Sequence, residues 1–199
     1  MTTGISRSRA KRLLDEAKSG RLSGAELDEV VRALQGPPEA LDADLYTLLH
    51  IVGLASDADA HAGLVERFVD HREDPPVAAL ALKVLCLWWG RTGDRLEEVR
   101  AALEGAEWDE DEDARLAACS IAGEYLRDHA DPALLRILMA TAEDREALPG
   151  TREHALYEVG RALGHSHEEL LHRKSSGRPV LPGVLGEEAA ARLAREEPG

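Results

Sequence analysis

The sequence predicts an all-α fold built as a stack of helical hairpins. Four stretches of equal length align without gaps, at residues 44–55, 77–88, 114–125 and 151–162. The first two are offset by 33 residues and the later pairs by 37, a period typical of helical repeat arrays rather than of a single globular core. Aromatic residues make up only 4% of the chain, and abundant Ala, Leu, Glu and Arg favour helices over strands.

The first elements are two short helices, expected over residues 5–18 and 23–35. Ser23 and Glu26 have the spacing of a capping box at the start of the second helix. The Gly-Pro-Pro sequence at 36–38 ends that helix. Residues 1–38 match the repeat poorly, as the terminal units of repeat arrays often do. We therefore predict that residues 1–38 form an N-terminal helical hairpin cap.

Residues 39–174 are predicted to form the repeats, each a helix, a turn and a second helix. The first helices carry a broad apolar stripe, and one column of the alignment contains small residues at Gly53, Cys86, Gly123 and Gly160. Small side chains there indicate that one helix approaches the next closely. The second helices show apolar triplets with i, i+3, i+4 spacing, namely Val65, Phe68 and Val69, then Val99, Ala102 and Leu103, then Leu135, Leu138 and Met139.

Residues 114–123 and 151–160 resemble the first helix of the HEAT-repeat family, V-R-x-A-A-x-x-A-L-G followed by a Gly-Asp turn. The stretch 77–94 ends in Gly-Asp, as the family's turn does. Leu45 and Ala78 stand where the family has arginine, and Thr151 replaces its first apolar residue. The resemblance covers residues 42–174 and implies a right-handed α-α superhelix, a HEAT-like solenoid of about four helical hairpins.

After Lys174 the sequence becomes rich in turn-forming residues, from Ser175 to Gly183. A last short helix is expected over residues 187–196, where apolar residues recur on one side. Residues 175–199 are therefore predicted to be a loop and a short C-terminal helix. This helix either caps the last repeat or extends freely from it.

The formal net charge of −14 disfavours nucleic acid and anionic lipid as partners and favours a basic protein. The sequence contains neither a secretory signal nor an apolar run long enough to cross a membrane. A cytoplasmic protein is expected. Its two cysteines, Cys86 and Cys119, lie in apolar stretches and are interpreted as buried free thiols.

A partner is expected on the second helices, which line the concave face of a solenoid. Glu66, Arg100 and Arg136 share one row of that face, and the N-terminal half is acidic. The acidic run 109–113 follows Trp108 and is either a solvated loop or a docking patch with an aromatic anchor. Of the adjacent Trp88 and Trp89, one is expected to be exposed. The candidate partner-binding residues are Glu66, Asp70, Trp89, Glu97, Arg100, Glu104, Trp108, Asp109, Asp111, Asp113 and Arg136.

No catalytic, metal or cofactor site is predicted. A calcium loop starting at Asp109 fails, because Ala114 and Ser120 occupy its glycine and bidentate-acid positions. His165, His167 and His172 form a histidine cluster, but they lack the i, i+4 spacing of a zinc helix. The sequence contains no nucleophile elbow and no Gly-rich phosphate loop.

These observations predict a non-enzymatic HEAT-repeat scaffold that binds a basic protein through its concave face and acidic loop. An immunity or antitoxin protein that sequesters a basic nuclease toxin would have these properties. Two alternatives remain open. One is an enzyme on the same scaffold, such as a HEAT-like DNA-lesion glycosylase, with an exposed Trp beside a carboxylate. The other is a regulator that binds a small ligand or a modified peptide in an apolar groove.

Overall fold

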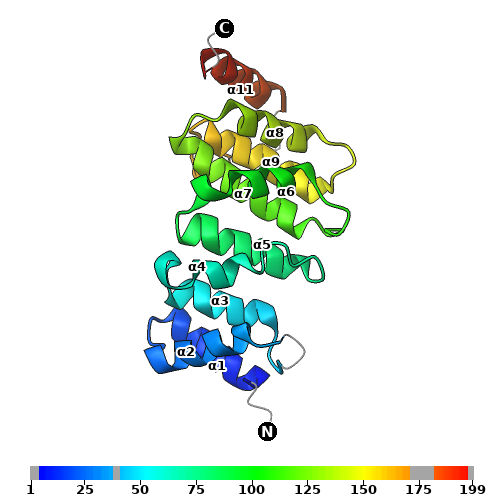
Figure 1. Cartoon of the computed structure of the whole chain (residues 1–199). Helices are drawn as coiled ribbons and strands as arrows, with labels where there is room; N and C mark the ends of the chain where they lie inside the picture. The colour runs from blue at the N-terminus through cyan, green and yellow to red at the C-terminus, as the bar shows by residue number, and fades with distance from the viewer. Residues whose placement is uncertain (1–4, 38–40, 171–181, 197–199) are drawn as a thin grey trace. The chain divides into compact units, whose positions relative to one another are not determined.

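The computed structural model describes residues 5–37, 41–170 and 182–196. All regular secondary structure in these ranges is helical, which confirms the all-α prediction. The chain divides into two compact units, Met1–Arg91 and Thr92–Gly199 (Figure 1). This division falls inside the second predicted repeat. The predicted domain boundaries, after residues 38 and 174, lie outside the described residues.

The first unit begins with two helices that both pack against the third helix of the chain. Its elements are α1 (Arg7–Lys18), α2 (Gly24–Gln35), α3 (Leu45–Ala55), α4 (Ala58–Glu66), α5 (Pro75–Lys83) and the π-helical η2 (Val84–Trp88). The capping box of Ser23 and Glu26 is present at the start of α2. Helix α4 is shorter than the apolar triplet suggested, so Phe68 and Val69 lie in the turn that follows it.

The glycine column marks a close approach in this unit. A Cβ atom on Gly53 of α3 would lie 2.6 Å from Val84 Cγ2 and 2.7 Å from Trp88 Cζ3, both in η2. No side chain fits there without displacing its neighbours. The predicted reason for the small residue, close packing of one first helix on the next, is confirmed at this position.

The second unit contains η3 (Thr92–Arg95), α6 (Leu96–Glu104), α7 (Asp113–Asp128), α8 (Pro132–Glu143), α9 (Pro149–Ala162) and α11 (Pro182–Glu196). Helices that were predicted to play the same part in successive repeats contact each other. The predicted first helices α7 and α9 are in contact, and so are the predicted second helices α6 and α8 (Figure 1). Fully buried residues such as Leu103, Ile121 and Leu138 fill the space between them.

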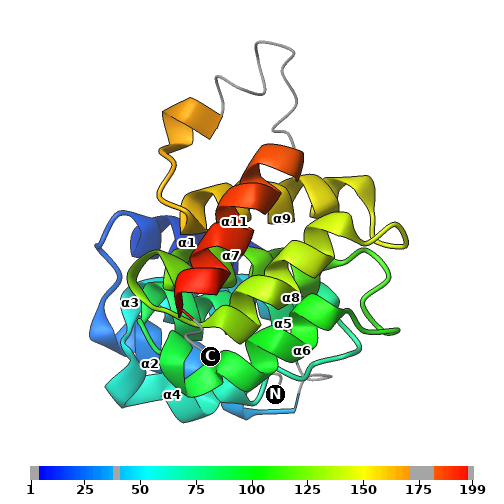
Figure 2. The same cartoon turned by 90° about the horizontal axis from the view of Figure 1, so that it is seen from above.

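The last helix lies against α8 and α9 (Figure 2) and begins earlier than predicted, at Pro182. Leu185 and Ala189 bury its apolar side. Arg192 donates to the carbonyl oxygens of Ala162, at 2.7 Å, and His129, at 3.0 Å, next to the C-terminal ends of α9 and α7. A cation near helix C-termini satisfies their carbonyl groups and opposes their dipoles. The helix therefore does not extend freely but packs on α8 and α9.

Candidate functional site

Two loops of the second unit are joined around one buried arginine. Arg115, in the first turns of α7, is 7% exposed. Its Nε donates to the carbonyl oxygen of Leu103 at 2.8 Å, Nη1 to Glu112 Oε1 at 2.9 Å, and Nη2 to Asp144 Oδ2 at 2.7 Å. A single guanidinium therefore holds the end of α6, the α6–α7 loop (residues 105–112) and the start of the α8–α9 loop (residues 144–148).

Two carboxylates of the α6–α7 loop complete this junction. Asp109 Oδ2 accepts from the backbone N–H of Arg115 at 3.1 Å, and Glu112 Oε2 accepts from the backbone N–H of Leu148 at 2.9 Å. Burial alone would raise the pKa of Glu112, but hydrogen bonds, including those from Leu148 and Arg115, hold it below its usual value. The hydrogen bond from Arg115 also lowers the pKa of Asp144. Both carboxylates are therefore kept ionised.

The outer surface of the joined loops is acidic. Its exposed carboxylates form what we call the acidic rim: Glu104, Glu107, Glu110, Asp111 and Glu146. Trp108 is half-buried within the rim, whereas Leu148 is 44% exposed. One basic residue, Arg145, is exposed on the α8–α9 loop. Residues 92–199 contain 24 acidic and 13 basic residues, so this unit carries −11 of the net charge of −14.

The predicted acidic run does not act as one exposed patch. Asp109 is only 4% exposed and accepts from the Arg115 backbone N–H, so its side chain is not part of the exposed surface of the run. Asp111 is exposed, as a docking patch requires, and Asp113 is half-buried in the first turn of α7. The run is thus divided between carboxylates that hold the loop and carboxylates that face solvent.

The other predicted residues of this unit lie on its second helices. Glu97 is exposed on α6 and pairs with Arg100 at 2.6 Å. Arg100 is half-buried and also contacts Asp131 Oδ2, at 2.7 Å. Arg136 is exposed on α8. Because Arg100 is engaged by two carboxylates, it stabilises the packing of α6 near the start of α8.

Three predicted residues belong to the first unit. Glu66 is half-buried, and Asp70 is exposed and pairs with Arg72 at 2.9 Å. Trp89 is also half-buried, and its indole N–H donates to the carbonyl oxygen of Gly53 at 3.2 Å. Its neighbour Trp88 is the more exposed of the pair, at 39%. The exposed indole that the sequence predicted is therefore that of Trp88 rather than Trp89.

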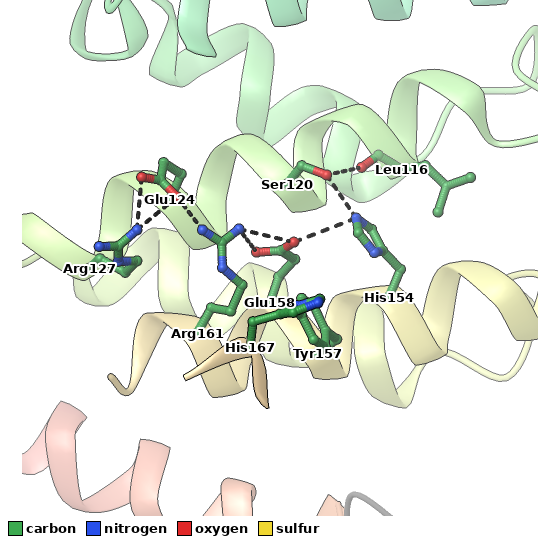
Figure 3. Close-up of polar contacts among 9 residues, drawn as sticks. All are labelled: Leu116, Ser120, Glu124, Arg127, His154, Tyr157, Glu158, Arg161 and His167. Carbon is green, nitrogen blue, oxygen red and sulfur yellow. Dashed lines mark hydrogen bonds and ion pairs between the residues drawn. The ribbon is translucent and has the colours of Figure 1, made fainter. Parts of the chain in front are cut away.

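A second polar cluster lies between α7 and α9 (Figure 3), and the sequence reasoning missed it. Glu158 of α9 is 2% exposed, and Arg161 Nη1 lies 3.1 Å from its Oε2. The same guanidinium pairs with Glu124 of α7 through Nη2. In the repeat alignment Glu158 occupies the column of Ile51, Val84 and Ile121. An acid in an otherwise aliphatic column is the sequence signal that would have identified it.

The cluster also contains a serine and a histidine, but not in a nucleophilic arrangement. Ser120 Oγ lies 2.7 Å from His154 Nε2, and Glu158 Oε1 lies 3.8 Å from the same nitrogen (Figure 3). In a Ser-His-acid triad the serine and the acid contact different ring nitrogens. Ser120 and Glu158 therefore share one ring nitrogen instead of forming a relay.

Burial shifts the ionisation of two groups in the cluster. It raises the pKa of Glu158 to about 7, an effect that Arg161 opposes and the negative charge of Glu124 increases. Burial also raises the pKa of the Cys119 thiol to about 12. Cys119 is thus a protonated, fully enclosed thiol, as the sequence suggested for both cysteines, and Cys86 is buried as well.

Across the described residues, no group of His, Cys, Asp and Glu side chains is arranged to hold a metal ion. Of the predicted histidine cluster, His165 pairs with Glu188 of α11 at 2.6 Å and His167 contacts the hydroxyl of Tyr157, whereas His172 lies outside the described residues. A half-open apolar groove between α8, α9 and α11 is lined by Met139, Ala142, Glu143, Leu156, Val159 and Gly186.

No described helix is both long enough and apolar enough to cross a membrane. No protein-family model, curated protein or solved structure matches the chain.

Proposed function

We propose that the chain is a non-enzymatic, HEAT-like scaffold that binds a basic protein through the acidic rim of its second unit. The observation that carries this proposal is the buried Arg115 junction. It fixes two acidic loops against each other through contacts of 2.7 to 2.9 Å. Carboxylates on ordered loops lose less conformational freedom on binding than carboxylates on mobile ones.

Charge supports the choice of a basic partner. A unit with a net charge of −11 attracts cationic surfaces over distances of about a Debye length and accelerates their association. Leu148 and Trp108 provide apolar surface beside the rim carboxylates. Protein interfaces commonly combine an apolar centre with a charged surround.

The packing within each unit supports the HEAT-like part of the proposal. In the second unit, first helices contact first helices and second helices contact second helices, the pattern of stacked hairpins. In both units the glycine column faces the next first helix, at Gly53 and at Gly123. A cytoplasmic immunity or antitoxin protein that neutralises a basic nuclease toxin is the specific form of the function that we propose.

The enzyme alternative has less support. It required an exposed Trp89 or Trp108 beside a carboxylate and a pocket. Trp89 donates its indole N–H to Gly53, and neither indole lines the groove between α8, α9 and α11. The apolar groove is the feature that the ligand-binding alternative would use, and it contains no cluster of converging polar groups.

The first experiment identifies the partner and tests the rim together. The immobilised protein captures proteins from a lysate of its own cells at low salt, and the captured protein is identified, purified and titrated by calorimetry. The test variant is Glu107→Lys, Glu110→Lys, Asp111→Lys. Its matched control is Asp15→Lys, Asp28→Lys, Glu73→Lys, which reverses three exposed acids of the first unit.

We expect the partner to be basic and its affinity to fall at least about tenfold for the rim variant. The control variant has the same net charge and should retain most of the affinity. Equal losses for both variants would indicate non-specific attraction, and no loss for the rim variant would refute the proposed site.

A further inference from the structure

An ionisable side chain occupies an alignment column that holds aliphatic residues in the other three copies. Ile51, Val84 and Ile121, which share the alignment column of Glu158, are all 0% exposed. Glu158 is buried almost as completely, at 2%. At the equivalent contact within the first unit, Gly53 meets Val84, the residue of this column, so packing alone does not require an acid. An ionised carboxylate in such a position is costly unless it is fully compensated.

The surroundings of Glu158 leave little space for hydration. A Cβ atom on Gly123 of α7 would lie 2.8 Å from the Cβ atom of Glu158, so the α7 backbone lies directly against this side chain. In the first unit Gly53 meets Val84, a residue of the same column, in the same way. An ionised Glu158 can therefore gain water only if α7 and α9 move apart.

Compensation by neighbouring charges is incomplete. From α7, Cys119, Ser120 and Glu124 lie around the carboxyl group, and from α9, His154 and Arg161 do so. Arg161 is the cation that contacts it, and this guanidinium also pairs with Glu124. Glu124 pairs in addition with Arg127 at 2.9 Å, but the side chains of that pair are 45% and 43% exposed, so water screens it. When Glu158 is ionised, Arg161 therefore divides its contacts between two carboxylates. When Glu158 is neutral, Arg161 no longer divides its charge between two carboxylates.

We propose that Glu158 makes the contact between α7 and α9 proton-dependent: the contact is closed when this carboxyl group is neutral and loosens when it is ionised. Burial raises the pKa of Glu158 to about 7, so the change falls within the physiological range. Helix α7 follows the α6–α7 loop and α9 follows the α8–α9 loop. The two loops of the acidic rim therefore depend on helices whose contact responds to pH.

The test is hydrogen exchange of the full chain between pH 6 and pH 8, with each rate corrected for the intrinsic pH dependence of exchange. If the carboxyl group has a pKa of about 7 when closed and its usual 4.5 when open, the opening equilibrium constant of α7 and α9 rises about tenfold across this range. We expect that rise in the native protein, whereas Glu158→Gln should change less than twofold. The helices α1 and α2 of the first unit serve as internal references.

His154 faces the same carboxyl group, so His154→Gln is the control, and it should retain the rise. The proposal is overturned if Glu158→Gln responds to pH as the native protein does, or if only His154→Gln abolishes the response. If a variant does not fold, a carbon NMR titration of the Glu158 carboxyl group in the unmodified protein still tests the proposal by measuring the pKa of this group. A midpoint near 7 supports the proposal, and one below 5 overturns it. Neither test depends on the identity of a partner.

Discussion

Replacement of Arg115 tests whether one side chain holds the two rim loops together. Arg115→Met keeps most of the apolar stem but removes the guanidinium and its contacts with Leu103, Glu112 and Asp144. The carbonyl oxygen of Leu103 keeps a second donor nearby, the Thr141 hydroxyl at 3.2 Å, which it shares with the carbonyl oxygen of Ile137 at 3.0 Å. The cost should therefore come from the two carboxylates that lose their cation.

The size of the stability loss depends on how well water can reach those two carboxylates. Removing one partner of a buried ion pair usually costs about 3–5 kcal/mol. The side chains of Glu112 and Asp144 are 13% and 31% exposed, so water can recover part of that cost. We expect the free energy of unfolding of the second unit to fall by about 3 kcal/mol, a large share of a typical total of about 5–15 kcal/mol.

The assay is urea unfolding at pH 7, followed by far-UV circular dichroism and fitted with a separate transition for each unit. The matched control is Arg127→Met, which removes an i, i+3 pair with Glu124 whose side chains are 45% and 43% exposed. Exposed pairs contribute little, so this change should cost less than about 1 kcal/mol. If Arg115→Met costs no more than Arg127→Met, the argument for a buried junction is refuted.

Three further predictions use the same unfolding assay or simple labelling. Gly53→Ala should destabilise the first unit by about 1–3 kcal/mol because its Cβ would lie 2.6 Å from a neighbouring methyl group. The control is Gly63→Ala in α4, where a Cβ would have nothing within 4 Å, and it should stabilise the unit by about 0.4–1 kcal/mol. Equal effects of the two substitutions would contradict the close approach at Gly53. Cys119, whose pKa burial raises to about 12, should react with a thiol reagent at pH 8 only after unfolding, so rapid labelling of the native protein would show that it is accessible. Because the pKa of Glu158 is raised, the folded state holds one more proton than the unfolded state between pH 4.5 and 7. The free energy of unfolding should therefore fall by up to about 3 kcal/mol as pH rises through this window. Glu158→Leu should remove this pH dependence, so the same pH dependence of unfolding in both proteins would contradict the shift.

Helix positions were largely readable from the sequence because apolar periodicity reports which residues are buried. That signal does not report whether a buried residue is helical. Phe68 is 5% exposed but lies in a turn beyond α4, so the triplet that contains it predicted burial correctly and helix length wrongly. The π-helical stretch of η2 was not predictable either, because its sequence aligns with ordinary first helices in the other repeats.

The candidate site was less predictable, because its arrangement depends on contacts distant in sequence. A run of adjacent acids looks uniformly solvated. Asp109 turns inward because it accepts a hydrogen bond from the backbone N–H of Arg115. The loop is held by the contact of the Arg115 side chain with Asp144, 29 residues later in the chain. By contrast, Glu158 could have been identified by reading down the alignment columns, since its position is aliphatic in the other three copies.

The most direct test of the proposed function is the association rate constant between the purified partner and this protein, measured by stopped flow at several ionic strengths. For the native protein and the first-unit control variant, we expect the rate constant to fall steeply as salt is raised. For Glu107→Lys, Glu110→Lys, Asp111→Lys we expect a rate at low salt that is lower by about tenfold and a much flatter salt dependence. A rim variant that associates as fast as the native protein at every ionic strength would contradict binding of a basic partner at the acidic rim.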